Sequence, residues 1–247
     1  GSGNARVSLK LQLPLSDGGQ PVVQGSVRFM GNEIQLWRSL PSIQNVSGEL
    51  AFSDRGFQIN GIQGGLLGGP TALSGGTQRD GAVQVRAEGS VSADGITRGF
   101  NTAEMRRLMK KMSGSTRYSM QLRIRNQRPE ITLDSTLAGL ALDFPAPLGK
   151  SQAEAMPMRF ALTPLNTSDP TVQQEEIRLN LGRSMAARYL MQRTNARTAP
   201  WKLVRGGIGV NLPPPQPESG VAININVPAL NVDCLLYTSD AADDTPC

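Results

Sequence analysis

The chain contains no histidine, and its two cysteines, Cys234 and Cys247, both lie in the last fourteen residues. A Ser-His-Asp triad is therefore excluded, and residues 1–233 hold no cysteine nucleophile, disulfide framework or Cys/His zinc site. A metal site would need carboxylates alone. The neighbours Glu175 and Glu176 lie on an expected strand, where adjacent side chains point to opposite faces. We therefore predict no catalytic residues, no metal site, no cofactor and no enzymatic activity.

Long apolar runs and aromatic residues are also scarce. No stretch approaches the ~20 apolar residues that a membrane-spanning helix needs, and no signal peptide is visible. Aromatic residues make up 4% of a chain with 27 glycines and 17 prolines, a composition that favours many short strands and turns. Because the chain starts at Gly1 and not at a methionine, we expect it to be a piece of a longer protein.

Residues 234–247 are expected not to belong to the protein. Back-translation of residues 234–244 reads as a transposase adapter from DNA sequencing libraries, so the reading frame has run on into it. This segment adds three aspartates and no basic residue, and the net charge of residues 1–233 is therefore three units above the +5 of the whole chain. A natural acidic tail is the alternative. We expect the segment to form no part of the core.

The rest of the chain alternates apolar and polar residues. Between Tyr118 and Arg125 every second residue is apolar, so the strand has one apolar and one polar face. Turn signals such as Asp54-Arg55-Gly56 separate successive runs and predict an antiparallel meander. Strands are expected at residues 6–15, 22–30, 33–38, 45–53, 56–63, 82–92, 115–126, 129–137, 156–163, 174–181, 185–193, 201–211 and 220–232.

One short amphipathic helix is predicted at about residues 101–112, which makes the fold class mainly β with a single helix. Asn101 and Glu104 have the spacing of a capping box. Methionine and leucine recur at helical spacing, and basic residues occupy the other face: Met105, Leu108, Met109, Met112, Arg106, Arg107, Lys110 and Lys111. An anionic membrane surface is one use for such a helix. Packing against a sheet is the more common use.

Arginine supplies most of the basic excess, and much of it lies on the polar steps of strands, as at Arg28, Arg86 and Arg123. A solvated outer sheet face accounts for this pattern, and binding to anionic lipid is the alternative. Sheets that bind nucleic acid usually offer exposed aromatic residues for stacking. The apolar steps here are mostly aliphatic, so we predict no nucleic-acid partner.

Three further motifs have simple structural interpretations. The segment Gly149-Lys150-Ser151 is not a phosphate loop, because Phe144 stands where that motif requires glycine. The glycine pairs at residues 64–65 and 68–69 are interpreted as turns. Residues 213–217, four of which are proline, are interpreted as a long turn or linker.

An ordered set of motifs resembles the periplasmic region of the YhdP family, within the AsmA-like group that includes TamB. The set comprises residues 31–37, Leu40-Pro41, residues 46–52, the glycine turns up to Pro70, and residues 137–142 followed by 145–150. It covers most of residues 5–230, and its strongest part is the stretch LAGLALDFPAPLGK. Phe144 departs from the leucine that the family commonly has there.

The resemblance implies an inner-membrane-anchored protein that extends through the periplasm of Gram-negative bacteria. It implies phospholipid transport between the inner and outer membranes, with phospholipid as partner, and a meander curled into a trough with an apolar inner face. Residues 1–233 would form this groove as one segment or as two stacked units, 1–150 and 151–233. The side chains expected to line it are Val27, Phe29, Leu50, Phe52, Phe57, Ile59, Val83, Val85, Met120, Leu122, Ile124, Ile131 and Leu133.

Two other functions remain open on the sequence alone. A structural or adhesive β-sandwich of the envelope would pack two apolar faces shut and bind no ligand. A carboxylate-based hydrolase would need two acidic side chains that converge in a cleft. The width of the gap between apolar faces separates the first of these from a lipid groove.

Overall fold

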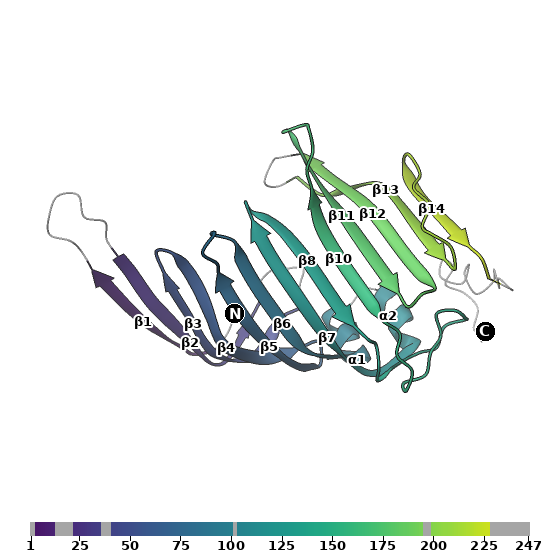
Figure 1. Cartoon of the computed structure of the whole chain (residues 1–247). Coiled ribbons are helices and arrows are strands. Elements are labelled where there is room, and N and C mark those ends of the chain that lie inside the picture. Colours follow the sequence, from purple (N-terminus) through teal and green to yellow (C-terminus); the bar gives the residue numbers. More distant parts are fainter. Residues whose placement is uncertain (1–2, 13–21, 36–40, 101–102, 195–198, 228–247) are drawn as a thin grey trace.

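The computed structural model describes residues 3–12, 22–35, 41–100, 103–194 and 199–227. They form one curled sheet with two short helices at the base of its central strands (Figure 1). This confirms the mainly β fold class. Asn101 and the segment 234–247 lie outside the described residues, so the expectations placed on them stay predictions.

Most element bounds follow the expected alternation. The separate strand expected at residues 33–38 is wrong, because β2 continues without a break to Ile34, and residues 36–38 lie outside the described residues. The strands are β1 (Ala5–Gln12), β2 (Val22–Ile34), β3 (Ile43–Ser53), β4 (Gly56–Leu66), β5 (Gly69–Thr77), β6 (Val83–Ser92), β7 (Met112–Arg125), β8 (Arg128–Ser135), β9 (Leu140–Leu142), β10 (Met158–Leu165), β11 (Val172–Leu181), β12 (Met185–Thr194), β13 (Lys202–Val210) and β14 (Gly220–Ile225). The helices are α1 (Ala93–Gly99) and α2 (Ala103–Lys110). The expected helix corresponds to α2, and Met112 belongs to β7.

Each strand pairs with the next one along the chain, apart from β9, which pairs with the start of β7. The pairs from β1 to β13 are antiparallel, which confirms the meander. The last pair, β13–β14, is parallel, so an antiparallel arrangement is wrong there. The proline-rich segment causes this difference: prolines cannot donate to a sheet ladder, and the segment returns across β13 instead of turning back beside it.

Glycines on β13 make room for that crossing. A Cβ on Gly207 would lie 1.9 Å from the carbonyl oxygen of Pro215, and one on Gly209 would lie 2.1 Å from that of Leu212. We expect Gly207→Ala to displace the crossing segment and to lower the melting temperature. Gly65→Ala is the matched control, since its Cβ would meet nothing nearer than 3.8 Å. Thermal unfolding of both variants tests this, and equal melting temperatures would contradict it.

Three elements were not predicted. Strand β5 was hidden because the glycines around residues 64–69 suggested only turns, whereas Leu67 and Gly68 alone make the turn. A Cβ on Gly69 would lie 2.1 Å from the carbonyl oxygen of Ser90, so close backbone approach explains that glycine. Helix α1 is capped by Ser92, whose hydroxyl accepts a hydrogen bond from the Gly95 N–H at 3.0 Å. The three-residue strand β9 lacks alternation long enough to detect.

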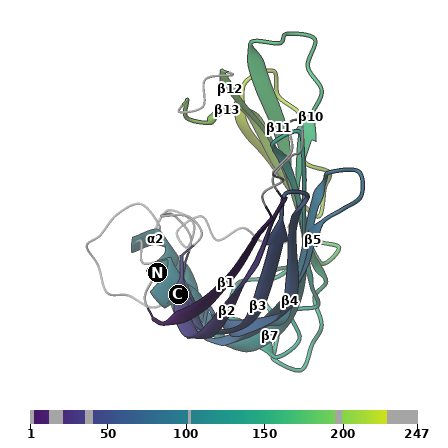
Figure 2. The ribbon, with the colours of Figure 1, turned by 90° about the vertical axis from the view of Figure 1, so that its left-hand side faces the viewer.

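The sheet is bent as well as twisted. Seen from the β1 edge, the strands sweep through a curve, with α2 near one end of the bent strands (Figure 2). Thirteen strands lie side by side in the main path, and at a spacing of about 4.8 Å they span about 60 Å. The trough-like sheet implied by the family resemblance is confirmed.

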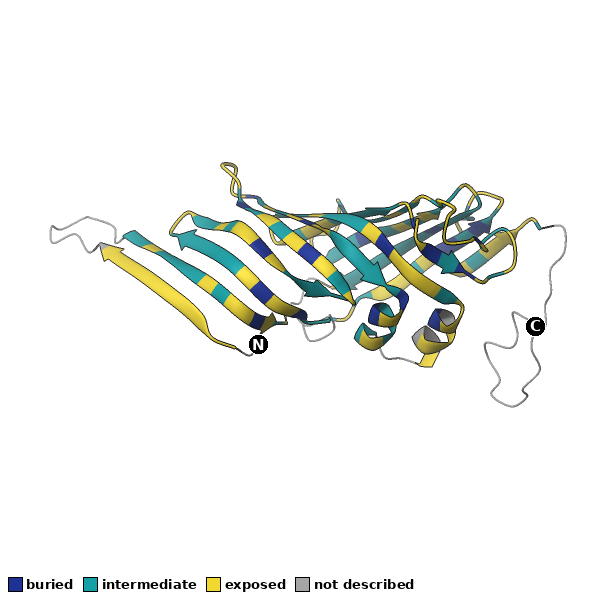
Figure 3. Ribbon diagram, turned by 90° about the horizontal axis from the view of Figure 1, so that it is seen from below, coloured by how far each residue is buried: buried dark blue, intermediate teal, exposed yellow. Residues whose placement is uncertain are grey.

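Most of the buried apolar side chains belong to two small clusters, and Ala82, Ala87, Met109 and Ala187 are buried outside them (Figure 3). One cluster is formed by Ile43, Val46 and Ile62. The other joins Ala93 to the segment after β8, through Leu137, Leu140 and Leu142. Most of the sheet between and beyond these clusters is only half-buried, so the described part of the chain has no continuous closed core beneath its strands.

Candidate functional site

The strand register arranges apolar residues in rows that cross the sheet. Directly paired residues place their side chains on the same face. One such row runs Val7, Val27, Leu50, Ile59, Gly75, Val85, Leu122, Ile131, Leu162, Ile177 and Tyr189. A parallel row runs Leu73, Ala87, Met120, Leu133, Phe160, Leu179, Ala187, Ile208 and Ile223. We call the face that carries these rows the apolar face.

All thirteen residues predicted to line a groove lie on this face, and all of them are half-buried. Their intervening neighbours, such as Arg28, Gln58 and Gln121, are exposed on the other face. The closed core of a sandwich would bury such side chains, whereas an open surface would leave them exposed. Half-burial is typical of side chains that pack beside one another with nothing above them. Their role as lipid contacts stays a prediction.

Both edges of the sheet leave the apolar rows uncovered. On β1, Val7 and Leu9 are each 62% exposed, and on β14 Ile223 is 56% exposed. Exposure of this kind on neighbouring residues marks an interaction surface. The apolar face therefore extends to both edges of the described sheet.

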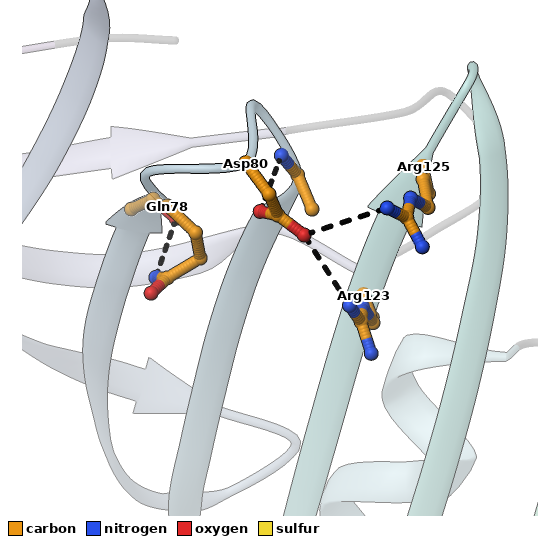
Figure 4. A network of polar contacts seen from close by, with 6 residues as sticks. Gln78, Asp80, Arg123 and Arg125 are labelled. Carbon is orange, nitrogen blue, oxygen red and sulfur yellow. Dashed lines mark hydrogen bonds and ion pairs between the residues drawn. The ribbon is translucent and has the colours of Figure 1, made fainter.

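The opposite face is charged and internally paired. Arg28 lies across from Glu49 with an N···O distance of 3.2 Å, and Arg159 lies 3.7 Å from Asp134. In the β5–β6 turn, one oxygen of Asp80 lies 3.6 Å from Arg123 and 3.8 Å from Arg125 of β7 (Figure 4). Exposed pairs of this kind each stabilise the fold only slightly. They agree with a solvated polar face.

The stretch LAGLALDFPAPLGK folds around a buried lysine. The ammonium of Lys150 donates to the backbone carbonyls of Leu137 and Ser151, each at 2.9 Å, and to that of Leu140. Burial lowers the pKa of the Lys150 ammonium. The hydrogen bonds of Lys150 thus stabilise the segment 137–142. The leucines of this segment pack against Met158 and Leu181 at one end of the apolar face. This role is structural, in keeping with the absence of a phosphate loop.

One polar group interrupts the apolar face near the start of β11 and the end of β12. Gln173 and Glu175 occupy apolar-face positions of β11, where their direct partners are Arg193 and Met191. Two nitrogens of Arg193, Nε and Nη2, donate to Gln173 Oε1 at 2.9 and 2.8 Å. The guanidinium also lies 4.7 Å from the centre of the Trp201 ring. We call Gln173, Glu175, Arg193 and Trp201 the rim cluster.

Adjacent residues of a strand point to opposite faces, and the register confirms this prediction for Glu175 and Glu176. Glu176 lies on the polar face, where it is ion-paired with Arg178 and Arg188. Glu175 lies between the apolar-face partners Pro164 and Met191. These two carboxylates therefore do not converge as a hydrolase would require. The sequence pattern did not predict the rim cluster. A signal was present, because Gln173, Glu175 and Arg193 are polar residues at positions of β11 and β12 where the alternation calls for apolar ones.

Burial raises the pKa of the Glu175 carboxyl, and the nearby charge of Arg193 only partly opposes this. A raised folded pKa means that the stability this group contributes is present below its ordinary value of 4.5 and is lost as pH rises through the folded pKa. We therefore expect Glu175→Gln to melt at a higher temperature than the unsubstituted protein at pH 7, with the difference shrinking towards pH 4. Melting curves across that range test the sign, with the exposed Glu130→Gln as control.

The described ranges contain no group of three acidic, histidine or cysteine side chains that could hold a metal ion. None of the helices there is long and apolar enough to cross a membrane.

Comparison with known proteins gives one match. Residues 1–242 match the model of the family described as YhdP protein. No curated protein and no solved structure matches. The matched span includes part of the segment 234–247, whose foreign origin stays a prediction.

Proposed function

The chain belongs to the YhdP family, and we propose that its curled sheet shields the acyl chains of phospholipids on its apolar face. By this route it supports the movement of phospholipids between the inner and outer membranes of a Gram-negative envelope. The family assignment supports a cell-envelope protein concerned with lipid transport. A periplasmic location, with the anchor in parts of the protein outside this chain, belongs to the same proposal.

The observation that carries the proposal is the continuity of the apolar face. One row passes from β1 to β12 and the other from β5 to β14, and neither contains a charged residue. At about 0.8 kcal/mol per methylene, exposing two acyl chains with about 30 methylenes to water costs on the order of 24 kcal/mol. A surface about 60 Å long that covers those methylenes removes most of this barrier. Lowering the barrier in this way requires neither a catalytic nucleophile nor nucleotide hydrolysis.

A structural or adhesive sandwich is the alternative function. It requires a second layer over the apolar face, and the described strands form a single layer. Half-burial of Leu122 and Ile131 favours the groove over the sandwich.

The proposal is tested by the lipid content of the purified protein. We expect phospholipid to co-elute with the chain in gel filtration and to be identified by mass spectrometry after extraction. An unrelated soluble β-sheet protein, expressed and purified identically, is the control. Phospholipid no higher than in that control, together with failure to take up lipid from vesicles, would contradict the proposal.

A further inference from the structure

Glu175 and Arg193, the two charged members of the rim cluster, can each form further hydrogen bonds to a ligand. Glu175 is only 9% exposed and accepts no hydrogen bond from the described residues, although its carboxylate oxygens keep some contact with solvent. Arg193 acts on it only as a nearby charge. A carboxylate that is largely desolvated and accepts no hydrogen bond from the protein is less stable than one in water. Its surroundings therefore favour a ligand that brings both a positive charge and N–H donors.

Arg193 is held in place while keeping donors free. A guanidinium has five N–H donors, and two of its nitrogens donate to Gln173 Oε1. The Trp201 ring supports one face of the group. The remaining donors have no acceptor within the described chain. An arginine fixed in this way is suited to bind phosphate.

We infer that the rim cluster is a headgroup site for phospholipids that carry a primary ammonium beside the phosphate, as ethanolamine phospholipids do. Arg193 donates to the phosphate oxygens, and Glu175 accepts from the ammonium. This inference rests on the proposed function, because the acyl chains then lie on the adjoining apolar rows. Met191 and Ile177 are the first apolar side chains that they meet.

The positions of the two charges fit one headgroup. Gln173 pairs with Arg193 and Glu175 pairs with Met191, so Glu175 and Arg193 are diagonal neighbours on β11 and β12. Diagonal neighbours lie about 7–8 Å apart at the backbone, within reach of each other's long side chains. A headgroup whose phosphate and ammonium are joined by two carbons can therefore contact both side chains at once.

Other headgroups leave part of the site unsatisfied. A glycerol headgroup offers phosphate to Arg193 but no cation to Glu175. A choline headgroup offers a cation without N–H donors. Since an unmet hydrogen bond to a charged group is worth about a tenfold change in affinity or more, ethanolamine should be preferred over both.

Trp201 provides a local signal for the test. In a Trp37→Phe background Trp201 is the sole tryptophan, and its fluorescence is followed during titration with short-chain ethanolamine, choline and glycerol phospholipids. We expect the ethanolamine lipid to bind about tenfold more tightly than the other two. O-phosphoethanolamine, which has no acyl chains, should bind far more weakly. Equal affinity for it would identify a site for a small soluble molecule and overturn the lipid assignment.

Substitutions then assign the two contacts. Glu175→Gln should bind all three lipids with nearly equal affinity, and Arg193→Gln should weaken all three. The polar-face variants Glu130→Gln and Arg159→Gln should behave as the unsubstituted protein, and circular dichroism checks the fold of each variant. Equal affinities in the unsubstituted protein, a choline preference, or an ethanolamine preference that survives Glu175→Gln would overturn the headgroup inference alone. Failure of every lipid to bind would instead count against the proposed function.

Discussion

Leu122→Asp is expected to leave the protein folded and to reduce its bound phospholipid by more than half. Leu122 is half-buried between Val85 and Ile131 on the apolar face. In an open groove water solvates the new carboxylate, so only the packing of one half-buried leucine is lost, about 1–2 kcal/mol. A charge facing acyl chains costs about 2–4 kcal/mol, which weakens lipid binding there by about 30-fold or more.

The control lies one residue away on the other face. Arg123→Asp is unsuitable as that control, because Arg123 is ion-paired with Asp80 and lies opposite Glu130. Gln121→Asp is cleaner, because Gln121 is exposed and lies opposite Arg86. It should change neither the melting temperature nor the lipid content. Unfolding of Leu122→Asp would favour a closed sandwich, and a folded variant with normal lipid content would count against a groove at β7.

Lys150→Met should produce the largest loss of stability. The substitution removes the ammonium that binds three backbone carbonyls and leaves the buried Leu140 carbonyl without that partner. We expect a loss of about 3 kcal/mol, which for a chain of this size lowers the melting temperature by about 6–12 °C. The exposed Lys202→Met is the control. An unchanged melting temperature for Lys150→Met would show that water satisfies these carbonyls.

Much of the fold follows from alternation alone. A two-residue period fixes which side chains share a face, and antiparallel hairpins fix the order of the strands, so the thirteen side chains predicted to line a groove can be assigned to one face from the sequence. Alternation fails where glycine replaces the apolar step. Gly75 stands in the main apolar row between Ile59 and Val85, so β5 has no apolar side chain at that step.

Features that depend on contacts between distant parts of the chain could not be predicted from the alternation. The role of Lys150 depends on carbonyls up to thirteen residues away. The parallel β14 depends on a close approach between Gly207 and Pro215. The rim cluster depends on the pairing of Gln173 with Arg193, which only the register reveals.

The single-layer sheet has a consequence for cooperativity. Each strand of the main path packs chiefly on its two neighbours, so stability is approximately a sum of nearest-neighbour terms, as in repeat proteins. Such arrays open from their ends and need not unfold in one all-or-none step. Amide hydrogen exchange should therefore be fastest in β1 and β14 and slowest near β7, where α1, β6, β8 and β9 all contact the same strand.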